Sequence, residues 1–243
     1  MYDGSEFHGW QVQPGLATVQ GALAVAIERV TGERVLPQGS GRTDAGVHAL
    51  AQVASCALET PIPPDNLVKA LNDVLPTAVR VTEAEEMAPS FHARKSARAK
   101  TYRYRILRAA ICPPFVARYV YHHPFPLDEH AMAASASSVV GEHDFTSFAA
   151  VDPERGSEDE PASNVRTVYT SEWRSDREEL IYTVRGSGFL HHMVRNLVGT
   201  FLLVGKGTLA PQEIAQILDA RDRSANPGAT APASGLYLVG VEY

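Results

Sequence analysis

Residues 97–108 read ARAKTYRYRILR, and this stretch decides the class of fold. Tyr102, Tyr104 and Ile106 alternate in it with Arg103 and Arg105. An alternation of period two is typical of a β-strand, because successive side chains of a strand point to opposite faces of the sheet. We therefore expect a strand whose aromatic and cationic side chains face opposite sides.

Helical and strand-like patterns interleave on both sides of this strand. Apolar residues at helical spacing begin after Thr18, which can cap a helix, and end at Gly32, which can terminate one. Further helices are expected at 64–74, from Asp128 to Gly141, at 188–204 and from Pro211 onward. Further strands are expected at 33–37, 49–58, 78–85, 164–174, 179–186 and 236–243, and a mobile acidic loop at 151–163.

The order of these elements predicts the fold class. They do not follow a strict strand–helix–strand rhythm, which favours an α+β fold with mixed or antiparallel sheets. Cys112-Pro113-Pro114 interrupts the pattern near the middle of the chain. We expect two similar subdomains, 1–111 and 112–243, with sheets flanked by helices and a central cleft.

The composition is that of an ordinary globular protein. The chain has 243 residues, of which 44% are apolar and 21% charged, enough for one large domain or two small ones. It contains no run of about 18 apolar residues, and the segment around Asp3 and Glu6 lacks the apolar core of a secretory signal. Cys56 and Cys112 form no disulfide pattern, so we expect a cytoplasmic protein.

The charges are unevenly distributed along the chain. The net charge of −6 argues against a nucleic-acid partner, yet residues 87–117 contain no acidic residue. A basic stripe of this kind is compatible with phosphate binding, and the alternative is a solvated strand edge where cations prevent aggregation. The charge pattern alone does not decide between the two. The stripe consists of Arg94, Lys95, Arg98, Lys100, Arg103, Arg105 and Arg108.

The densest polar segment is residues 39–48, which read GSGRTDAGVH. Its glycines permit a tight or left-handed backbone and the close approach of a ligand. Asp44 follows Arg42 by two residues, so a nearby cation can keep the carboxylate ionised for a role as base or nucleophile. The alternative is structural, because a lone aspartate in a glycine-rich loop is often a turn or cap residue.

Motifs for familiar cofactors and metals are missing from the sequence. Gly205-x-Gly207 follows a helical pattern rather than a strand, so it is not a dinucleotide-binding motif. His191 and His192 are adjacent on the expected helix, so their side chains should diverge by about 100° and not bind one metal together. We expect neither a cofactor nor a metal.

Six motifs, in order along the whole chain, resemble those of one family. They are YDGSEFHGWQ at 2–11, GRTDAGVHA at 41–49, KTYRY at 100–104, EHDFTSF at 142–148, FLHHMVRN at 189–196 and GLYL at 235–238. With these motifs the chain resembles the tRNA pseudouridine synthase A family. Members have several strand residues before the first motif and only Met1 precedes it here, so about five to ten further residues of alternating polarity are expected upstream.

The resemblance implies a fold, a reaction and partners. It implies a two-domain α+β enzyme that isomerises uridine to pseudouridine in the anticodon stem-loop of tRNAs, at positions 38, 39 and 40. The N-glycosidic bond breaks, the base rotates and C5 bonds to C1′, with no cofactor. It also implies a homodimer that recognises the shape of the tRNA.

The resemblance also implies roles for single residues. Asp44 is the catalytic aspartate, and Arg195 is its ion-pair partner. Arg42 resembles the residue that intrudes when the target base leaves its stack. Tyr102 is expected to stack on the flipped uracil and to stand near C5, whereas Tyr104 is expected in the core. Phosphate contacts are expected from the whole basic stripe, of which Arg94, Lys95 and Arg98 are the candidate substrate-binding residues.

Two other functions stay open at this point. One is an RNA-binding protein on the same fold without catalysis, against which the intact set of Asp44, Tyr102 and Arg195 counts. The other is a cofactor-free hydrolase that uses Asp44 and releases free base. A hydrolase of that kind needs a second carboxylate within about 10 Å, which the sequence does not place.

Overall fold

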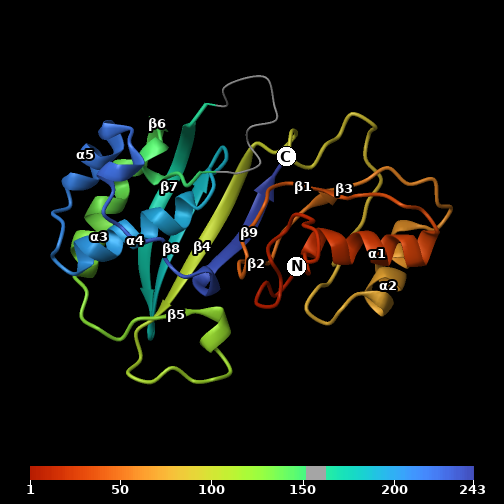
Figure 1. Ribbon diagram of the computed structural model, residues 1–243, viewed down its shortest axis with the longest axis horizontal. Coiled ribbons are helices and arrows are strands. Elements are labelled where there is room, and N and C mark those ends of the chain that lie inside the picture. Colours follow the sequence, from red (N-terminus) through yellow and green to blue (C-terminus); the bar gives the residue numbers. More distant parts are fainter. Residues whose placement is uncertain (152–162) are drawn as a thin grey trace. The chain divides into compact units, whose positions relative to one another are not determined.

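The chain divides into two compact units in the computed structural model, which describes residues 1–151 and 163–243 (Figure 1). One unit consists of Met1–Arg98 and Tyr237–Tyr243, and the other of Ala99–Leu236. Both combine helices with strands, so the expected α+β class is confirmed. The domains 1–111 and 112–243, the similarity of two subdomains and the central cleft stay predictions. Most of the acidic loop expected at 151–163 lies outside the described residues.

The first unit contains a helix with both of its predicted caps. Thr18 Oγ1 accepts a hydrogen bond from the Gly21 amide at 3.3 Å, and α1 (Val19–Thr31) ends at Gly32, whose φ of 78° is left-handed. Glycine takes that conformation without steric cost, so it stops the helix. Helix α2 (Pro64–Val74) packs against α1 and begins with a proline, which lacks the amide hydrogen that a first helical turn leaves unbonded.

The strands of the first unit are short. β1 (Gln38–Gly39) pairs antiparallel with β3 (Ala54–Ser55), and β2 (His48–Ala49) pairs parallel with β9 (Leu236–Glu242). The prediction of longer strands at 33–37, 49–58 and 78–85 is wrong. In residues 33–37 and 78–85, which are described throughout, the structure has no strand, and Val79 forms only an isolated bridge with Tyr2.

Segment 49–58 fails to form one strand because it changes its partner. The amides of Leu50 and Ala51 both donate to the carbonyl oxygen of Leu238, whereas the carbonyl oxygen of Val53 accepts from the Ser40 amide. One apolar run therefore serves two short pairings, which its composition does not reveal.

The second unit is built on long antiparallel strands (Figure 1). The strands expected at 97–108, 164–174 and 179–186 are confirmed. The antiparallel strands of this unit pair in the order β4 (Ala99–Leu107), β8 (Glu179–Gly186), β7 (Val165–Asp176) and β6 (Gly141–Asp144), and the short β5 (Tyr121–His122) pairs parallel with β4.

The predicted alternation of β4 is confirmed by its burial. Tyr102, Tyr104 and Ile106 are buried, whereas Arg103 is exposed. Tyr104 lies opposite Tyr182 of β8, and both rings are completely enclosed. The aromatic residues of this sheet therefore form the core of the second unit.

Helices α3 (Glu129–Ala136) and α4 (Met193–Gly205) pack against each other and against this sheet. The ring of Phe201 on α4 lies 5.4 Å from that of Tyr182 and 6.1 Å from that of Trp173. Most residues of α4 are buried, so the helix has to be apolar nearly all round.

The ends of α3 and α4 differ from the prediction. Helix α3 ends at Ala136, because a short 3₁₀ turn follows it and Gly141, with a φ of 114°, begins β6. Helix α4 begins at Met193 rather than at residue 188, because His192 has a left-handed φ of 57°. Helix α5 (Glu213–Ala220) begins two residues after Pro211. None of the helices in the described part of the chain is long and apolar enough to span a membrane.

Candidate active site

The N-terminal segment 2–11 holds the glycine-rich segment 39–48 through backbone contacts. The Trp10 amide donates to the carbonyl oxygen of Thr43 at 3.0 Å, and the Gly46 amide donates to that of Phe7 at 3.2 Å. The first two motifs of the sequence therefore form one structural element within the first unit.

Two glycines allow these backbones to lie so close together. A Cβ atom at Gly4 would overlap the carbonyl oxygen of Val47, and a Cβ atom at Gly9 would lie 2.5 Å from that of Thr43. Gly9 also has a left-handed φ of 85°. Any larger residue at either position would push segment 39–48 away, so these glycines fix where the segment lies.

Asp44 is half-buried on this segment, and Arg42 is exposed. The turn that follows Asp44 is closed by the main chain, because the Val47 amide donates to the Asp44 carbonyl oxygen at 3.1 Å and Gly46 has a left-handed φ of 78°. Main-chain groups thus supply the turn.

Side-chain hydrogen bonds join the segment to Tyr2 and Gln52. The Tyr2 hydroxyl lies 2.8 Å from Thr43 Oγ1. The Gln52 carboxamide donates to the Gly41 carbonyl oxygen at 2.9 Å and to the Tyr2 hydroxyl at 3.4 Å, and it accepts from Ser40 Oγ at 2.7 Å. Burial raises the pKa of Tyr2 to about 12, so its hydroxyl keeps its proton at neutral pH.

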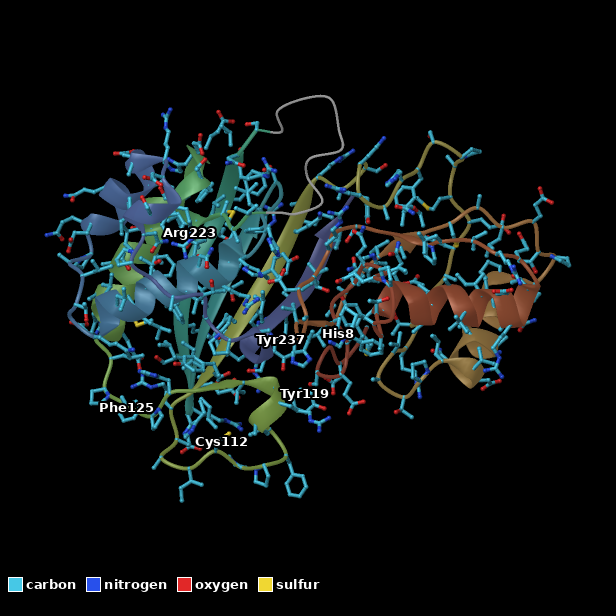
Figure 2. All side chains as sticks on the ribbon, in the orientation of Figure 1. His8, Cys112, Tyr119, Phe125, Arg223 and Tyr237 are labelled. Carbon is cyan, nitrogen blue, oxygen red and sulfur yellow. The ribbon has the colours of Figure 1, made fainter. Side chains whose placement is uncertain are left out.

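His48 closes the segment and is also buried. Its Nδ1 accepts a hydrogen bond from the Gly4 amide at 3.1 Å and lies 3.2 Å from Asp3 Oδ1. Its ring stacks on that of Tyr237, which is labelled in Figure 2, with centroids 4.8 Å apart. Since β2 pairs with β9 at this point, the C-terminal strand supports the end of the segment.

The basic residues near 95 lie on a turn that precedes β4. Arg94, Lys95 and Arg98 are exposed, as a phosphate-binding surface requires. The amides of Arg94 and Lys95 donate to His92 Nδ1 at 3.1 and 3.4 Å, which fixes the turn. We refer to Arg94, Lys95 and Arg98 as the basic turn.

Two arginines of the basic stripe have structural roles instead. Arg105 forms two hydrogen bonds with the Glu179 carboxylate, at 2.8 and 2.6 Å. Arg108 pairs with Glu129 at 3.0 Å and donates to the carbonyl oxygen of His123 at 3.0 Å. The expectation that the whole stripe contacts phosphate is therefore not supported for these two.

Tyr102 belongs to the second unit, where it faces Val184 of β8. Its ring meets that of Phe189 edge to face, with centroids 5.1 Å apart and planes at 84°. Phe189 opens the motif FLHHMVRN, so the third and fifth motifs meet here. This contact fixes the orientation of the Tyr102 ring.

Tyr104 is a core residue, as expected. Its hydroxyl donates to the carbonyl oxygen of Pro232 at 2.8 Å, and a Cβ atom at Gly235 would lie 2.7 Å from its ring. Burial raises the pKa of Tyr104 well above its usual value. The two tyrosines of the KTYRY motif thus have different surroundings.

Arg195 lies in the first turn of α4 and is half-buried. Its Nε donates to the carbonyl oxygen of Ala231 at 2.7 Å, and its own carbonyl oxygen accepts from the Ala231 amide at 3.1 Å. The main chain at Ala231 therefore orients the guanidinium. The positive charge of Arg195 also partly offsets the effect of burial on the pKa of Tyr104.

His191 and His192 do not diverge as predicted, because both precede α4 instead of lying on it. Their ring centroids are 4.0 Å apart. His191 Nδ1 lies 2.9 Å from the carbonyl oxygen of Val151. The predicted divergence of these two side chains is therefore wrong, and the expectation of no metal stays a prediction.

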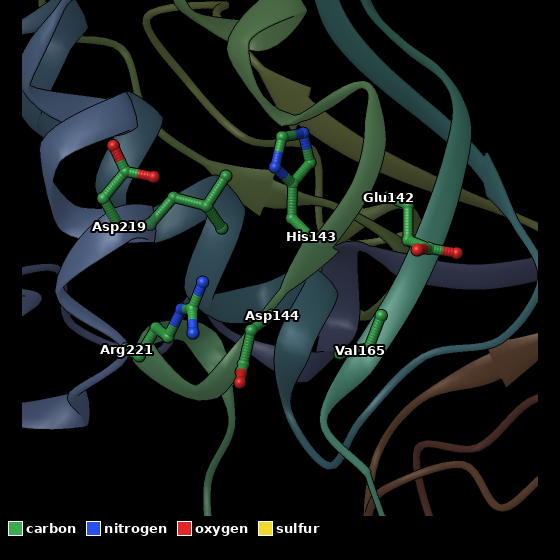
Figure 3. Close-up of a pocket in the computed structure, with 7 residues that line it drawn as sticks. Glu142, His143, Asp144, Val165, Asp219 and Arg221 are labelled. Atoms are coloured by element: carbon green, nitrogen blue, oxygen red, sulfur yellow. The ribbon is translucent and has the colours of Figure 1, made fainter.

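The second unit also has a surface pocket of about 270 Å³, which none of the predicted site residues lines (Figure 3). Motif 142–148 forms one wall, and Asp219 and Arg221 at the end of α5 form another. The Thr146 hydroxyl donates to Asp144 Oδ1 at 2.6 Å and lowers the pKa of that carboxyl. Asp144 therefore organises its own loop.

The predicted site residues come from both units. Asp44, Arg42 and the basic turn belong to the first unit, and Tyr102 and Arg195 belong to the second. The family described as tRNA pseudouridine synthase matches residues 1–96 and 135–243. The chain belongs to the tRNA pseudouridine synthase family.

Individual relatives agree with this membership. The chain is 53% identical over 242 residues to the tRNA pseudouridine synthase A of Solibacter usitatus, which covers 100% of this chain and 96% of the relative. The proteins of the same name from Brevibacillus brevis and Limosilactobacillus fermentum are 46% and 44% identical, and the matches cover 100% of this chain and 96% and 93% of theirs.

A chain of the crystal structure of a Cbf5–Nop10–Gar1 complex matches far more weakly. Its TM-score is 0.36 at 14% identity, over 90% of this chain and 44% of that one, which is too little to support a conclusion. As a member of the tRNA pseudouridine synthase family, the chain is an enzyme that isomerises uridine to pseudouridine in tRNA. The resemblance drawn from the six motifs is thereby confirmed.

Proposed function

We propose that this tRNA pseudouridine synthase acts on the anticodon stem-loop, at positions 38, 39 and 40, with Asp44 as its catalytic carboxylate. The observation that supports Asp44 most strongly is the backbone contact between segments 2–11 and 39–48, which only glycine permits at Gly4 and Gly9. A catalytic carboxylate has to be held rigidly, because misplacement by about 1 Å can cost about 100-fold in rate.

The proposed reaction needs an ionised carboxylate. The N1–C1′ bond breaks, the uracil turns, and C5 bonds to C1′, while C5 loses a proton and N1 gains one, so substrate and product are isomers. Asp44 attacks C1′, attacks C6, or removes a sugar proton to form a glycal, and each route requires the deprotonated form. Arg195 is proposed as the cation that keeps Asp44 ionised.

The target uridine has to leave its stack before it reacts, which costs a few kcal/mol. Arg42 is exposed on the same segment as Asp44, and we assign it to the gap that the base leaves. Tyr102, whose ring is fixed by Phe189, is assigned to stack on the extruded uracil and to stand near C5.

The basic turn is proposed to bind tRNA phosphates, which positions the RNA without reading its bases. Its side chains are exposed while its backbone is fixed by His92. The family resemblance further supports a homodimer, which we propose to work in the cytoplasm, where its tRNA substrate is found.

Replacing the three residues of the basic turn by alanine is expected to weaken tRNA binding and to flatten its salt dependence. The slope of log Kd against log salt should fall by about 0.7–0.9 for each lost phosphate contact, because each contact releases condensed counterions. Filter binding at several salt concentrations measures this slope.

A variant with alanine at Arg29, Arg34 and Lys69 is the matched control, since these exposed residues carry the same charge elsewhere in the first unit. It should keep the wild-type slope. If the basic-turn variant also keeps that slope, the basic turn is a solvated surface and not a phosphate-binding one.

The substrate position is tested with transcripts of one tRNA that each retain a single uridine. Three carry it at position 38, 39 or 40, and a fourth carries it outside the anticodon stem-loop. We expect pseudouridine in the first three and unmodified uridine in the fourth. Modification of the fourth alone would contradict the proposed position while leaving the family activity intact.

A further inference from the structure

We propose that Gln52 is a positioning residue for the segment that carries Asp44. Its carboxamide holds the backbone before Arg42 directly, and it holds the side chain of Thr43 through Tyr2. Gln52 thereby sets the direction in which the Asp44 carboxylate points. This inference rests on the proposed role of Asp44.

The carboxamide of Gln52 forms hydrogen bonds with three groups. Oε1 accepts from Ser40 Oγ at 2.7 Å, while Nε2 donates to the Gly41 carbonyl oxygen at 2.9 Å and to the Tyr2 hydroxyl at 3.4 Å. A carboxamide has one accepting oxygen and a nitrogen with two hydrogens, so it serves this pattern without an unused donor. A carboxylate or an aliphatic side chain cannot.

The direction of these hydrogen bonds shows how Gln52 acts on Thr43 through Tyr2. Nε2 of Gln52 can only donate, so the Tyr2 hydroxyl accepts there and has its own proton left for Thr43 Oγ1, 2.8 Å away. Burial keeps that proton in place at neutral pH by raising the pKa of Tyr2 to about 12. The residue directly before Asp44 is therefore fixed by a side chain 41 positions away.

The surroundings make these contacts hard to replace by water. Ser40 is 0% exposed, Tyr2 6% and Thr43 7%. A buried polar group that loses its hydrogen-bond partner destabilises the folded protein. We therefore expect segment 39–48 to move until its polar groups find other partners. A movement of segment 39–48 displaces the Asp44 carboxylate, whereas the residues of the basic turn, proposed to bind phosphate, lie outside that segment.

The test compares Gln52→Leu with Gln20→Leu. Leucine keeps the bulk of the side chain but can neither donate nor accept a hydrogen bond. Gln20 is a buried carboxamide of the same unit that bridges main-chain groups at Val12 and Pro37, both at 2.9 Å.

We expect Gln52→Leu to lower the single-turnover rate at saturating tRNA by about 10- to 100-fold, with KM within about twofold. Gln20→Leu should lower the melting temperature comparably and keep the rate within about twofold of wild type. Equal losses of rate would mean general loosening and would overturn the inference.

Tyr2→Phe provides a second and milder variant, because it removes one oxygen atom and keeps the buried ring. It should lower the rate several-fold at unchanged KM, and an unchanged rate would count against the inference even if Gln52→Leu fails to fold. Asp44→Asn is measured in parallel. If Asp44→Asn is active, the proposed role of Asp44 fails; if it is inactive while Gln52→Leu and Tyr2→Phe keep the wild-type rate, only the positioning inference fails.

Discussion

The Asp44→Asn variant is expected to lose pseudouridine formation by at least about 10³-fold, which corresponds to about 4 kcal/mol in activation free energy. Asparagine has the same shape but carries no charge, so it can neither attack carbon nor accept the proton. Binding of tRNA should stay within about threefold of wild type, because phosphate contacts supply most of the affinity. Single-turnover kinetics and filter binding measure the two quantities separately.

Asp73→Asn is the matched control for this variant, since Asp73 is an exposed aspartate on α2 in the same unit. It should leave both rate and affinity unchanged. Turnover by purified Asp44→Asn at more than a few per cent of the wild-type rate would show that another group performs the chemistry.

The two tyrosines of the KTYRY motif give the second large effect. Tyr102→Phe should lower the rate by about 10²–10⁴-fold with tRNA binding retained, because a hydroxyl that takes part in proton transfer contributes about that much. Tyr104→Phe should keep the rate, but it removes the donor to the Pro232 carbonyl oxygen, which costs about 1–3 kcal/mol of folding stability.

The same two variants therefore separate catalysis from stability. The rate of pseudouridine formation and the melting temperature are measured for each variant. Tyr102→Phe is expected to lower mainly the rate, and Tyr104→Phe mainly the melting temperature. Equal losses of rate in the two variants would remove the reason for assigning Tyr102 rather than Tyr104 to the substrate. The family match does not decide this point, because it leaves out residues 97–134.

The parts of the fold that follow from local patterns could be predicted from the sequence. The alternation in 97–108 predicted β4, and Thr18 and Gly32 predicted both ends of α1. The start of α4 could not be predicted, since the left-handed conformation of His192 depends on its tertiary surroundings. Likewise, the short strands near Ala49 and Ala54 depend on which distant segment pairs with each of them.

The candidate site divides in the same way. Asp44, Arg42, Tyr102 and Arg195 lie within motifs, so they could be selected from the sequence. Gln52 could not, because it lies just beyond the motif GRTDAGVHA and its importance comes from three contacts. The basic stripe also required the structure, which shows that Arg105 pairs with Glu179 while the basic turn is exposed.

The most direct test of the central claim is to incubate the purified protein with an unmodified tRNA transcript and to measure uridine, pseudouridine and free uracil after the reaction. We expect that each uridine lost from the anticodon stem-loop is recovered as pseudouridine, that no uracil is released, and that the conversion requires Asp44. Release of free uracil would indicate a hydrolase, and binding without conversion would indicate an RNA-binding protein; either result would overturn the assignment of this protein as a pseudouridine synthase.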